Sequence, residues 1–429
     1  MDIAEYFRLV NTQELRVLLL FGGPFTNALG DTVLATRHYD QLLSLLPKAK
    51  LIVWTADRET WKTICGKDVR CTPFISRAQL KSADVIIFDW VRVEQCTERL
   101  IADSRALVIV IPNSTGDLRY RFPGEDWRTV KLEPMISHSQ RITRAYAALG
   151  VMAGRRPPGG IKVTKSESVL FVNPYASSFS KCLQPMFLKP LLKSLPTICR
   201  DTPIVVPPVP ESAPGWERPQ YERLGELVTA AAKTTNLRVL SAMGRAEFIS
   251  SVRSCSLVIG PDTSTQHIAY RYDIPSISCY PWDSGYRYYY WGCPGPNSLC
   301  LRMPNPQDSR ANGSCARLVS ELAARLLHSH RRFGDSMHGD DPFSLLRVYD
   351  ALARRTMSLK RGKKVLHAEL AKIASTIPEE WTPFVIPELE QIGNEICDRW
   401  SEDSGVIDTV GLARLSDVYG MKILSVLLP

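Results

Sequence analysis

Short apolar runs recur along the first two thirds of the chain, each about as long as a buried strand. In the first part they cover residues 15–21, 51–54, 85–88 and 107–111. Amphipathic stretches separate them at 58–67 and 94–103, and a longer helical pattern follows the first run, starts near residue 27 and continues to Pro47. This alternation of strand and helix predicts an α/β fold with a parallel sheet.

A second set of strand-length runs follows residue 160. These runs cover residues 168–174, 203–206, 237–240, 257–259 and 276–280, and a helical pattern occupies 316–327. The stretch 154–160 between the two sets is rich in glycine and proline, which is typical of an exposed linker. We therefore expect two similar α/β domains, at 1–153 and 161–335.

The last part of the chain, 336–429, has a different pattern, with helical spacing of apolar residues at 343–348 and 365–373. We expect a mostly helical extension there. It contains a basic run made of Arg354, Arg355, Lys360, Arg361, Lys363 and Lys364. A solvated helical face is the favoured interpretation of this run, and contact with an anionic acceptor or a membrane surface is the alternative.

The composition is that of a soluble globular protein, with 45% hydrophobic and 23% charged residues in 429. The apolar run 17–21 is too short to span a bilayer, and the first five residues lack the basic start of a signal peptide. Eleven cysteines are scattered without a Cys-x-x-Cys pair, which favours reduced thiols over a zinc site. We expect a cytoplasmic protein, with peripheral contact at the inner face of a membrane as a further option.

The net charge of +9 favours an anionic ligand or surface. No nucleic-acid-binding motif accompanies this charge, so we expect no nucleic-acid partner.

One stretch, 256–275, combines a strand, a tight turn and the start of a helix. It reads Ser-Leu-Val-Ile-Gly-Pro-Asp-Thr-Ser-Thr-Gln-His-Ile-Ala up to residue 269. The start of a helix presents backbone N–H groups and a partial positive charge, which suit a diphosphate. Asp262, Thr263 and His267 would stand at this position, His267 one turn along the helix. The alternative is an ordinary capped helix whose histidine bonds to neighbouring backbone.

A second motif, Gly-Asp-Thr-Val-Leu-Ala-Thr at 30–36, follows the first strand. It places the carboxylate of Asp31 at a helix start beyond the carboxyl end of a strand, where open α/β sheets bind ligands. Asp31 could act as a catalytic base there or as the N-cap of the helix, and the two roles are compatible.

These two motifs together resemble the signatures of family 9 glycosyltransferases, the ADP-heptose:lipopolysaccharide heptosyltransferases. The family carries Gly-Asp-Val-Val-Leu-Ala-Thr near its start and Asp-Thr-Gly followed by His-Leu/Ile-Ala later, and Ser264 replaces that glycine here. The resemblance covers about the first three quarters of the chain. It implies a GT-B-like fold, with two Rossmann-like domains facing a cleft: an acceptor domain at 1–153 and a nucleotide-sugar donor domain at 161–335.

The resemblance also implies roles for particular residues. Asp31 matches the proposed catalytic base of the family, and Lys181 matches a lysine that contacts donor phosphate, although Cys-Leu-Gln-Pro follows it where the family has x-Trp-Pro. A solvated lysine before a helix is the alternative for Lys181. Asp262, Thr263, Ser264 and His267 match the donor-binding segment.

Further candidates for the cleft or the acceptor site are Gly30 and Asn27 at the first motif, and Trp282 and Tyr286 in an aromatic loop at 281–292. This loop could stack on a base or a sugar, or it could pack a wall of the cleft.

The sequence thus predicts a glycosyltransferase that moves a sugar from an ADP-linked or other nucleotide-diphosphate donor to an acceptor hydroxyl. We expect inversion, no metal and no further cofactor. The acceptor is left open among a glycan, a lipid-linked sugar, a natural product and a protein, and the oligomeric state is left open too. A GT-B-fold sugar-nucleotide epimerase and a non-catalytic nucleotide-sugar-binding protein are the alternatives.

Overall fold

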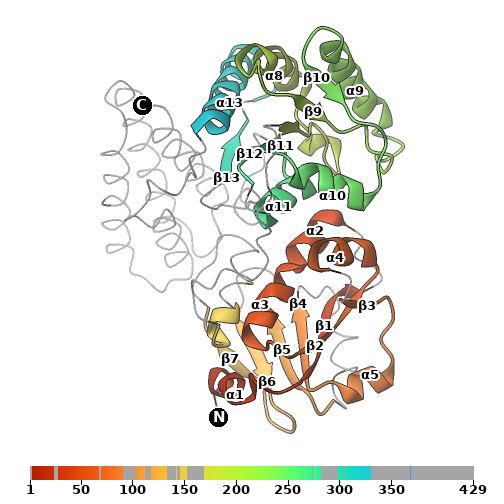
Figure 1. Cartoon of the computed structure of the whole chain (residues 1–429), viewed down its shortest axis with the longest axis vertical. Coiled ribbons are helices and arrows are strands. Elements are labelled where there is room, and N and C mark those ends of the chain that lie inside the picture. Colours follow the sequence, from red (N-terminus) through yellow and green to blue (C-terminus); the bar gives the residue numbers. More distant parts are fainter. Residues whose placement is uncertain are drawn as a thin grey trace, which may run out of the picture. The chain divides into compact units, whose positions relative to one another are not determined.

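A computed structural model describes residues 2–23, 28–66, 69–89, 101, 104–111, 117–132, 142, 145–151, 169–272, 274–281, 298–303, 305–329 and 368. The chain forms two compact units (Figure 1). The first comprises Met1–Lys162 and Gly244–Ser250, and the second comprises Val163–Met243 and Ser251–Pro429. The predicted linker at 154–160 and, apart from residue 368, the predicted helical extension at 336–429 lie outside the described residues.

The first unit is built on a seven-stranded sheet in the order β3-β2-β1-β4-β5-β6-β7. Its strands are β1 (Arg16–Gly23), β2 (Lys50–Thr55), β3 (Arg70–Thr72), β4 (Val85–Asp89), β5 (Leu107–Ile111), β6 (Leu118–Arg121) and β7 (Arg128–Val130). The first five strands are parallel, and β6 and β7 add an antiparallel edge. The parallel α/β core confirms the prediction. The edge hairpin was missed because its strands carry exposed arginines and have no continuous apolar run.

The helices of the first unit are α1 (Ile3–Val10), α2 (Leu29–Ala35), α3 (Arg37–Leu45), α4 (Arg58–Cys65) and α5 (Arg77–Ser82). The prediction of one continuous helix up to Pro47 is wrong, because the helix breaks at Thr36. The hydroxyl of Thr36 donates to the carbonyl of Val33 at 2.6 Å, a local bond that competes with regular helix geometry.

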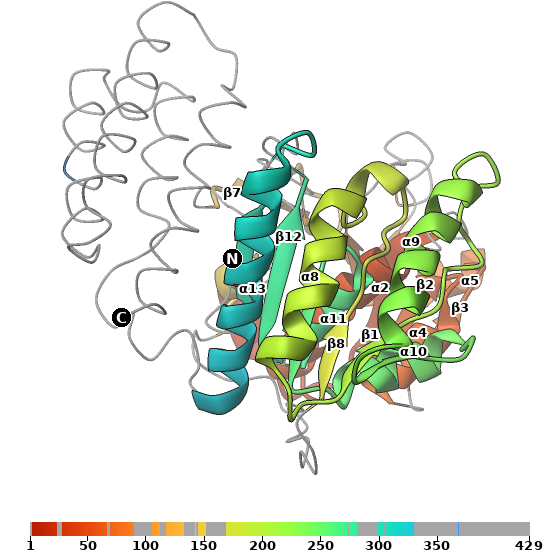
Figure 2. The same cartoon turned by 90° about the horizontal axis from the view of Figure 1, so that it is seen from above.

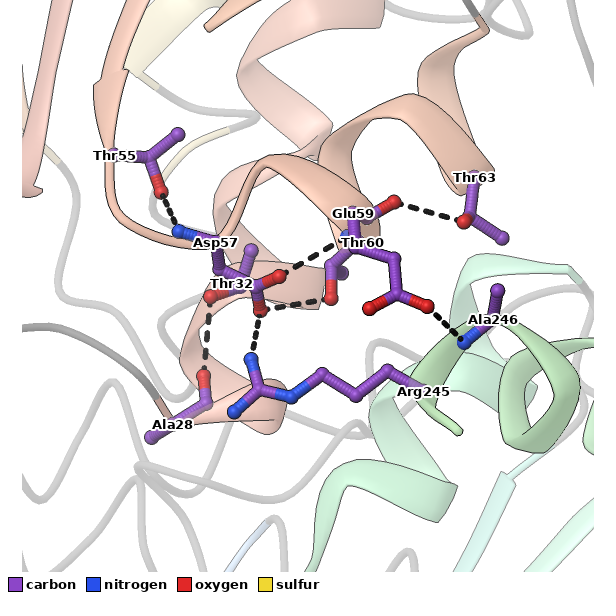
Figure 3. Close-up of polar contacts among 9 residues, drawn as sticks. All are labelled: Ala28, Thr32, Thr55, Asp57, Glu59, Thr60, Thr63, Arg245 and Ala246. Atoms are coloured by element: carbon purple, nitrogen blue, oxygen red, sulfur yellow. Dashed lines mark hydrogen bonds and ion pairs between the residues drawn. The ribbon is translucent and has the colours of Figure 1, made fainter. Parts of the chain in front are cut away.

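The segment Gly244–Ser250 belongs to the first unit through polar contacts at the start of α4 (Figure 3). The buried carboxylate of Asp57 caps α4 and pairs with Arg245 Nη1 at 2.5 Å. Glu59 Oε1 accepts a hydrogen bond from the backbone N–H of Ala246 at 3.2 Å. This bond satisfies one of the N–H groups that a helix leaves open at its start.

The second unit is built on a six-stranded parallel sheet in the order β10-β9-β8-β11-β12-β13. Its strands are β8 (Leu170–Val172), β9 (Ile204–Val206), β10 (Leu237–Val239), β11 (Leu257–Gly260), β12 (Ser276–Tyr280) and β13 (Ser298–Arg302). The first five strands confirm the predicted runs. β13 was not predicted, since it follows the aromatic loop without a clear apolar run.

The helices of the second unit are α8 (Pro185–Ile198), α9 (Arg218–Ala232), α11 (Ser264–Arg271) and α13 (Ser309–Ser329), with a 3₁₀ turn η1 (Phe179–Lys181). A further helix, α10 (Arg245–Arg253), is divided between the units, with 245–250 in the first and 251–253 in the second. Helices α8 and α13 lie side by side against the sheet (Figure 2). The apolar faces of both helices and the central strands form one buried core. In the part of the chain that the structure describes, no helix is long and apolar enough to cross a membrane.

Candidate functional site

The carboxyl ends of β8 and β11 define the candidate site of the second unit. These two strands are neighbours in the sheet, although β9 and β10 lie between them in the sequence. The chain therefore runs outward in opposite directions from this pair, and open α/β sheets bind their ligands at such a point. The loop after β8 leads to Lys181, and the loop after β11 leads to Asp262.

The two loops start from a close contact between Gly260 and Asn173. A Cβ atom on residue 260 would lie 2.9 Å from the Asn173 carbonyl oxygen and 3.4 Å from its Cβ. The first distance is shorter than a side chain tolerates, so only glycine lets the strands approach this closely. The requirement is steric, because the backbone of Gly260 does not have a positive φ.

The side chain of Asn173 ties the two loops together. Its Nδ2 donates to the hydroxyl of Thr265 at 2.7 Å and to that of Thr263 at 3.4 Å, and its Oδ1 accepts from the backbone N–H of Tyr175 at 3.0 Å. Asn173 and Thr265 are buried. A buried amide satisfied on both sides holds its partners firmly, because losing a partner would leave a polar group without a hydrogen bond.

The start of α11 is fixed by its own residues as well. Thr263 is the N-cap, and its hydroxyl accepts from the N–H of Thr265 at 3.3 Å. Gln266 is buried and donates to the carbonyls of Gly260 and Pro261, while its Oε1 accepts from the Tyr280 hydroxyl at 3.1 Å. The turn between strand and helix is therefore preorganised.

The structure brings Lys181 and Asp262 together at this site. Lys181 Nζ lies 3.5 Å from Asp262 Oδ2, with the lysine side chain 30% exposed and the aspartate 9% exposed. The two residues come from different loops, 81 positions apart in the sequence. A cation thus stands beside the residue that precedes the helix N-cap, and the ammonium group remains in contact with solvent.

The loop that carries Lys181 is anchored on both sides of it. The backbone N–H of Phe179 donates to Glu217 Oε2 at 3.0 Å, and the Phe179 ring contacts the Tyr221 ring edge-on. The thiol of Cys182 is fully buried and accepts from the N–H of Ala176 at 3.2 Å. Burial raises the pKa of Cys182 to about 11, so this thiol is protonated at neutral pH and is a poor nucleophile.

The other predicted residues of α11 lie in its first turns. Ser264 is the first residue of the helix and is half-buried, while His267 is 6% exposed. The role of His267 stays a prediction.

In the first unit, Asp31 is the third residue of α2 and is half-buried. The N-cap of α2 is Ala28, which has no capping side chain, so the interpretation of Asp31 as the N-cap is wrong. The carboxylate still lies in the first turn, where the helix dipole favours a negative charge. Gly30 precedes it in the same turn, and the helix follows β1, which neighbours β4 at the centre of the sheet.

Three predicted residues, Asn27, Trp282 and Tyr286, lie outside the described residues. Among the described residues, no group of three His, Cys, Asp or Glu side chains is arranged to hold a metal ion.

Sequence reasoning missed the residues that support the site. Asn173 directly follows β8, a central strand whose apolar run was predicted, and a polar residue at that position could have been recognised as a candidate. Gln266 and Tyr280 gave no such signal, because their pairing joins a helix to the next strand.

The sequence matches no model of a known protein family and no curated protein. Solved structures do match. E. coli ADP-heptose lipopolysaccharide heptosyltransferase II aligns with a TM-score of 0.50 at 14% identity, covering 74% of this chain and 100% of that chain. The chain has the heptosyltransferase fold.

Two further structures align at lower TM-scores. The E. coli heptosyltransferase WaaC, solved with ADP, gives 0.49 at 15% identity, covering 72% of this chain and 99% of that chain. A family 9 glycosyltransferase from Veillonella parvula gives 0.47 at 12% identity, covering 68% of this chain and 87% of that chain. The resemblance to family 9 and the GT-B-like, doubly Rossmann-like fold predicted from the sequence are confirmed at the level of fold.

Replacing Gly260 with alanine tests the close approach of β8 and β11. The new methyl group would press on the backbone of Asn173, so Gly260→Ala should lower the free energy of unfolding by about 1–3 kcal/mol, measured by urea denaturation. Gly215→Ala is the matched control, because a Cβ atom there meets nothing within 4 Å. Equal stabilities of the two variants would show that β8 and β11 tolerate a side chain between them.

Proposed function

We propose that this protein is a glycosyltransferase that binds a nucleotide-diphosphate sugar in its second unit and transfers the sugar to an acceptor hydroxyl. The observation that carries the proposal is the meeting of Lys181 and Asp262 beside the start of α11. A diphosphate needs both a cation and a set of oriented N–H groups, and these are the groups gathered there.

The ion pair also explains how the lysine is kept in place before a donor binds. Asp262 is 9% exposed, and the loop of Lys181 is anchored through Phe179 and Cys182. The ammonium group therefore needs little reorganisation to meet the leaving diphosphate. Preorganised charge of this kind is an effective way to stabilise a transition state.

We propose an ADP-linked sugar, heptose-like in size, as the donor. The sequence motifs at 30–36 and 260–269 support this choice, and so does the fold, which is that of a heptosyltransferase named for ADP-heptose. The acceptor hydroxyl belongs to a glycan, a lipid-linked sugar, a natural product or a protein, and the positive net charge favours an acceptor with anionic groups. We place the reaction in the cytoplasm, with the protein at most peripheral to a membrane.

Asp31 is the proposed general base. Its carboxylate takes the proton of the acceptor hydroxyl, and the oxygen attacks the anomeric carbon of the donor. The bond from that carbon to the diphosphate oxygen breaks, and its electron pair leaves with the diphosphate, which Lys181 stabilises. Attack from the side opposite the leaving group inverts the anomeric centre. These steps use side chains of this chain alone, so we propose transfer without a metal.

Removing the cation should weaken donor binding. Lys181→Ala leaves Asp262 to repel the diphosphate, and we expect ADP-sugar affinity, measured by isothermal titration calorimetry, to fall by about ten- to hundredfold. His267→Ala should weaken binding in the same direction. Lys189→Ala is the control, since it removes an equal charge from an exposed position on α8. A donor affinity in Lys181→Ala equal to that in Lys189→Ala would remove the diphosphate from this site.

Asp31→Asn separates a catalytic from a structural role. The amide cannot take the acceptor proton, and loss of a general base typically lowers a rate by about 10²–10⁴. We expect transfer to fall at least about a hundredfold, while ADP-sugar affinity stays near wild type. The melting temperature should fall by only a few degrees, because the lost charge–dipole interaction contributes about 0.3–1 kcal/mol.

The transfer assay itself can contradict the proposal. Wild-type turnover by Asp31→Asn would move the base to another residue. Interconversion of the donor without any acceptor would indicate an epimerase, and tight donor binding with no turnover across an acceptor panel would indicate a binding protein.

A further inference from the structure

Three polar side chains are buried together in the first unit and have no part in the proposed mechanism. His38 Nε2 lies 2.7 Å from Asp89 Oδ2, and the two side chains are 1% and 0% exposed. His38 Nδ1 lies 3.1 Å from the hydroxyl of Tyr146, which is also fully buried. Both ring nitrogens of His38 are thus in contact with a polar group.

Stability alone does not account for such a group. Taking a carboxylate out of water is costly, and well-packed apolar residues of similar volume often serve a protein equally well or better. Burial and the charge of Asp89 raise the pKa of Tyr146 well above its ordinary value, so Tyr146 is a neutral phenol at neutral pH. The group therefore keeps the Asp89 carboxylate next to the His38 ring, away from solvent.

That place is the central point of the first sheet. Asp89 is the last residue of β4, and its Cα pairs with that of Phe21 on β1. β1 and β4 are neighbours although β2 and β3 lie between them in the sequence, so this is where the chain reverses its direction across the sheet. The helix that follows β1 is α2, which carries Asp31.

His38 is connected to α2 through a hydrogen-bonded joint. Thr36 ends α2 and precedes α3, its N–H donates to the Thr32 carbonyl, and its own carbonyl accepts from the N–H of Tyr39, both at 3.1 Å. α2 has only seven residues and no side-chain cap, so its position depends on its packing against α4 and on its connection to α3. His38 lies in the first turn of α3.

We infer that His38, Asp89 and Tyr146 are positioning residues for Asp31. Their contacts fix the start of α3 against the end of β4. Because α3 is joined to α2 at Thr36, they also fix the position of α2 relative to the sheet. Apolar packing would bury the same surface but would let α2 slide or rotate. The inference of an effect on catalysis rests on the proposed function, whereas the effect on α2 does not.

An apolar triple variant tests the inference. His38→Leu, Asp89→Val and Tyr146→Phe together keep the volume of the group and remove its polar atoms, so the protein should melt within about 5 °C of wild type. We expect amide hydrogen exchange at 28–36 to become at least about tenfold faster, since α2 has lost its anchor. The value of kcat for transfer should fall at least about tenfold with the donor KM unchanged, and His38→Gln, which keeps a donor toward Asp89, should retain most of kcat.

Asp89→Asn covers the case in which the triple variant does not fold, because it changes the charge without changing the shape. It should accelerate exchange at 28–36 in the same way. Asp117→Asn is the control: it alters a half-buried carboxylate that accepts a hydrogen bond from the N–H of Leu132 at the β6 and β7 edge of the same sheet, and exchange at 28–36 and kcat should match wild type.

Wild-type exchange at 28–36 in folded triple or Asp89→Asn variants would overturn the inference. Absence of transfer in the wild-type protein would instead count against the proposed function, and the exchange measurement would still decide whether the group positions α2.

Discussion

The close approach of β8 and β11 is the constraint on which the candidate site depends. Because residue 260 has no side chain, the end of β11 lies against the backbone of Asn173, and a methyl group there would come within 2.9 Å of the carbonyl. This contact lets the Asn173 side chain reach Thr263 and Thr265 at the start of α11. The same contact sets the two loops beside each other, so Lys181 meets Asp262.

Both units place a buried polar side chain at the end of a central strand, and in each unit this side chain contacts a different kind of element. In each sheet a buried polar side chain stands at or just after the end of a central strand, at the point where the chain reverses direction: Asp89 on β4 and Asn173 after β8. Asn173 ties a helix start to a neighbouring loop, and Asp89 holds a helix through His38. In both cases the polar contact gives direction, which apolar packing alone does not supply.

Much of the fold could be predicted from the sequence because buried parallel strands leave a clear signal. Val85 to Phe88 and Leu257 to Ile259 are continuous apolar runs, and both are central strands. The break between α2 and α3 could not be predicted from the sequence, because threonine occurs both inside helices and at their ends. In the structure the Thr36 hydroxyl bonds to the Val33 carbonyl at this break. The edge strands β3, β6 and β7 were missed because they are partly exposed and carry arginine and threonine in place of a continuous apolar run.

Some residues of the candidate site could be predicted from the sequence and others could not. Asp31, Lys181 and Asp262 could be found because charged residues follow strands at positions that the family motifs share. The supporting residues Gln266 and His38 could not, because their partners Tyr280 and Asp89 are reached only through the fold. Asn173 follows a predicted strand, but its partner Thr265 is likewise known only from the fold.

The central claim is that the donor diphosphate binds between Lys181 and the start of α11. A crystal structure of the protein with an ADP-sugar tests it most directly. The account predicts diphosphate oxygens within hydrogen-bond distance of Lys181 Nζ and of backbone N–H groups in the first turn of α11. A diphosphate bound elsewhere, with Lys181 still paired to Asp262 and no ligand atom at that turn, would contradict the account.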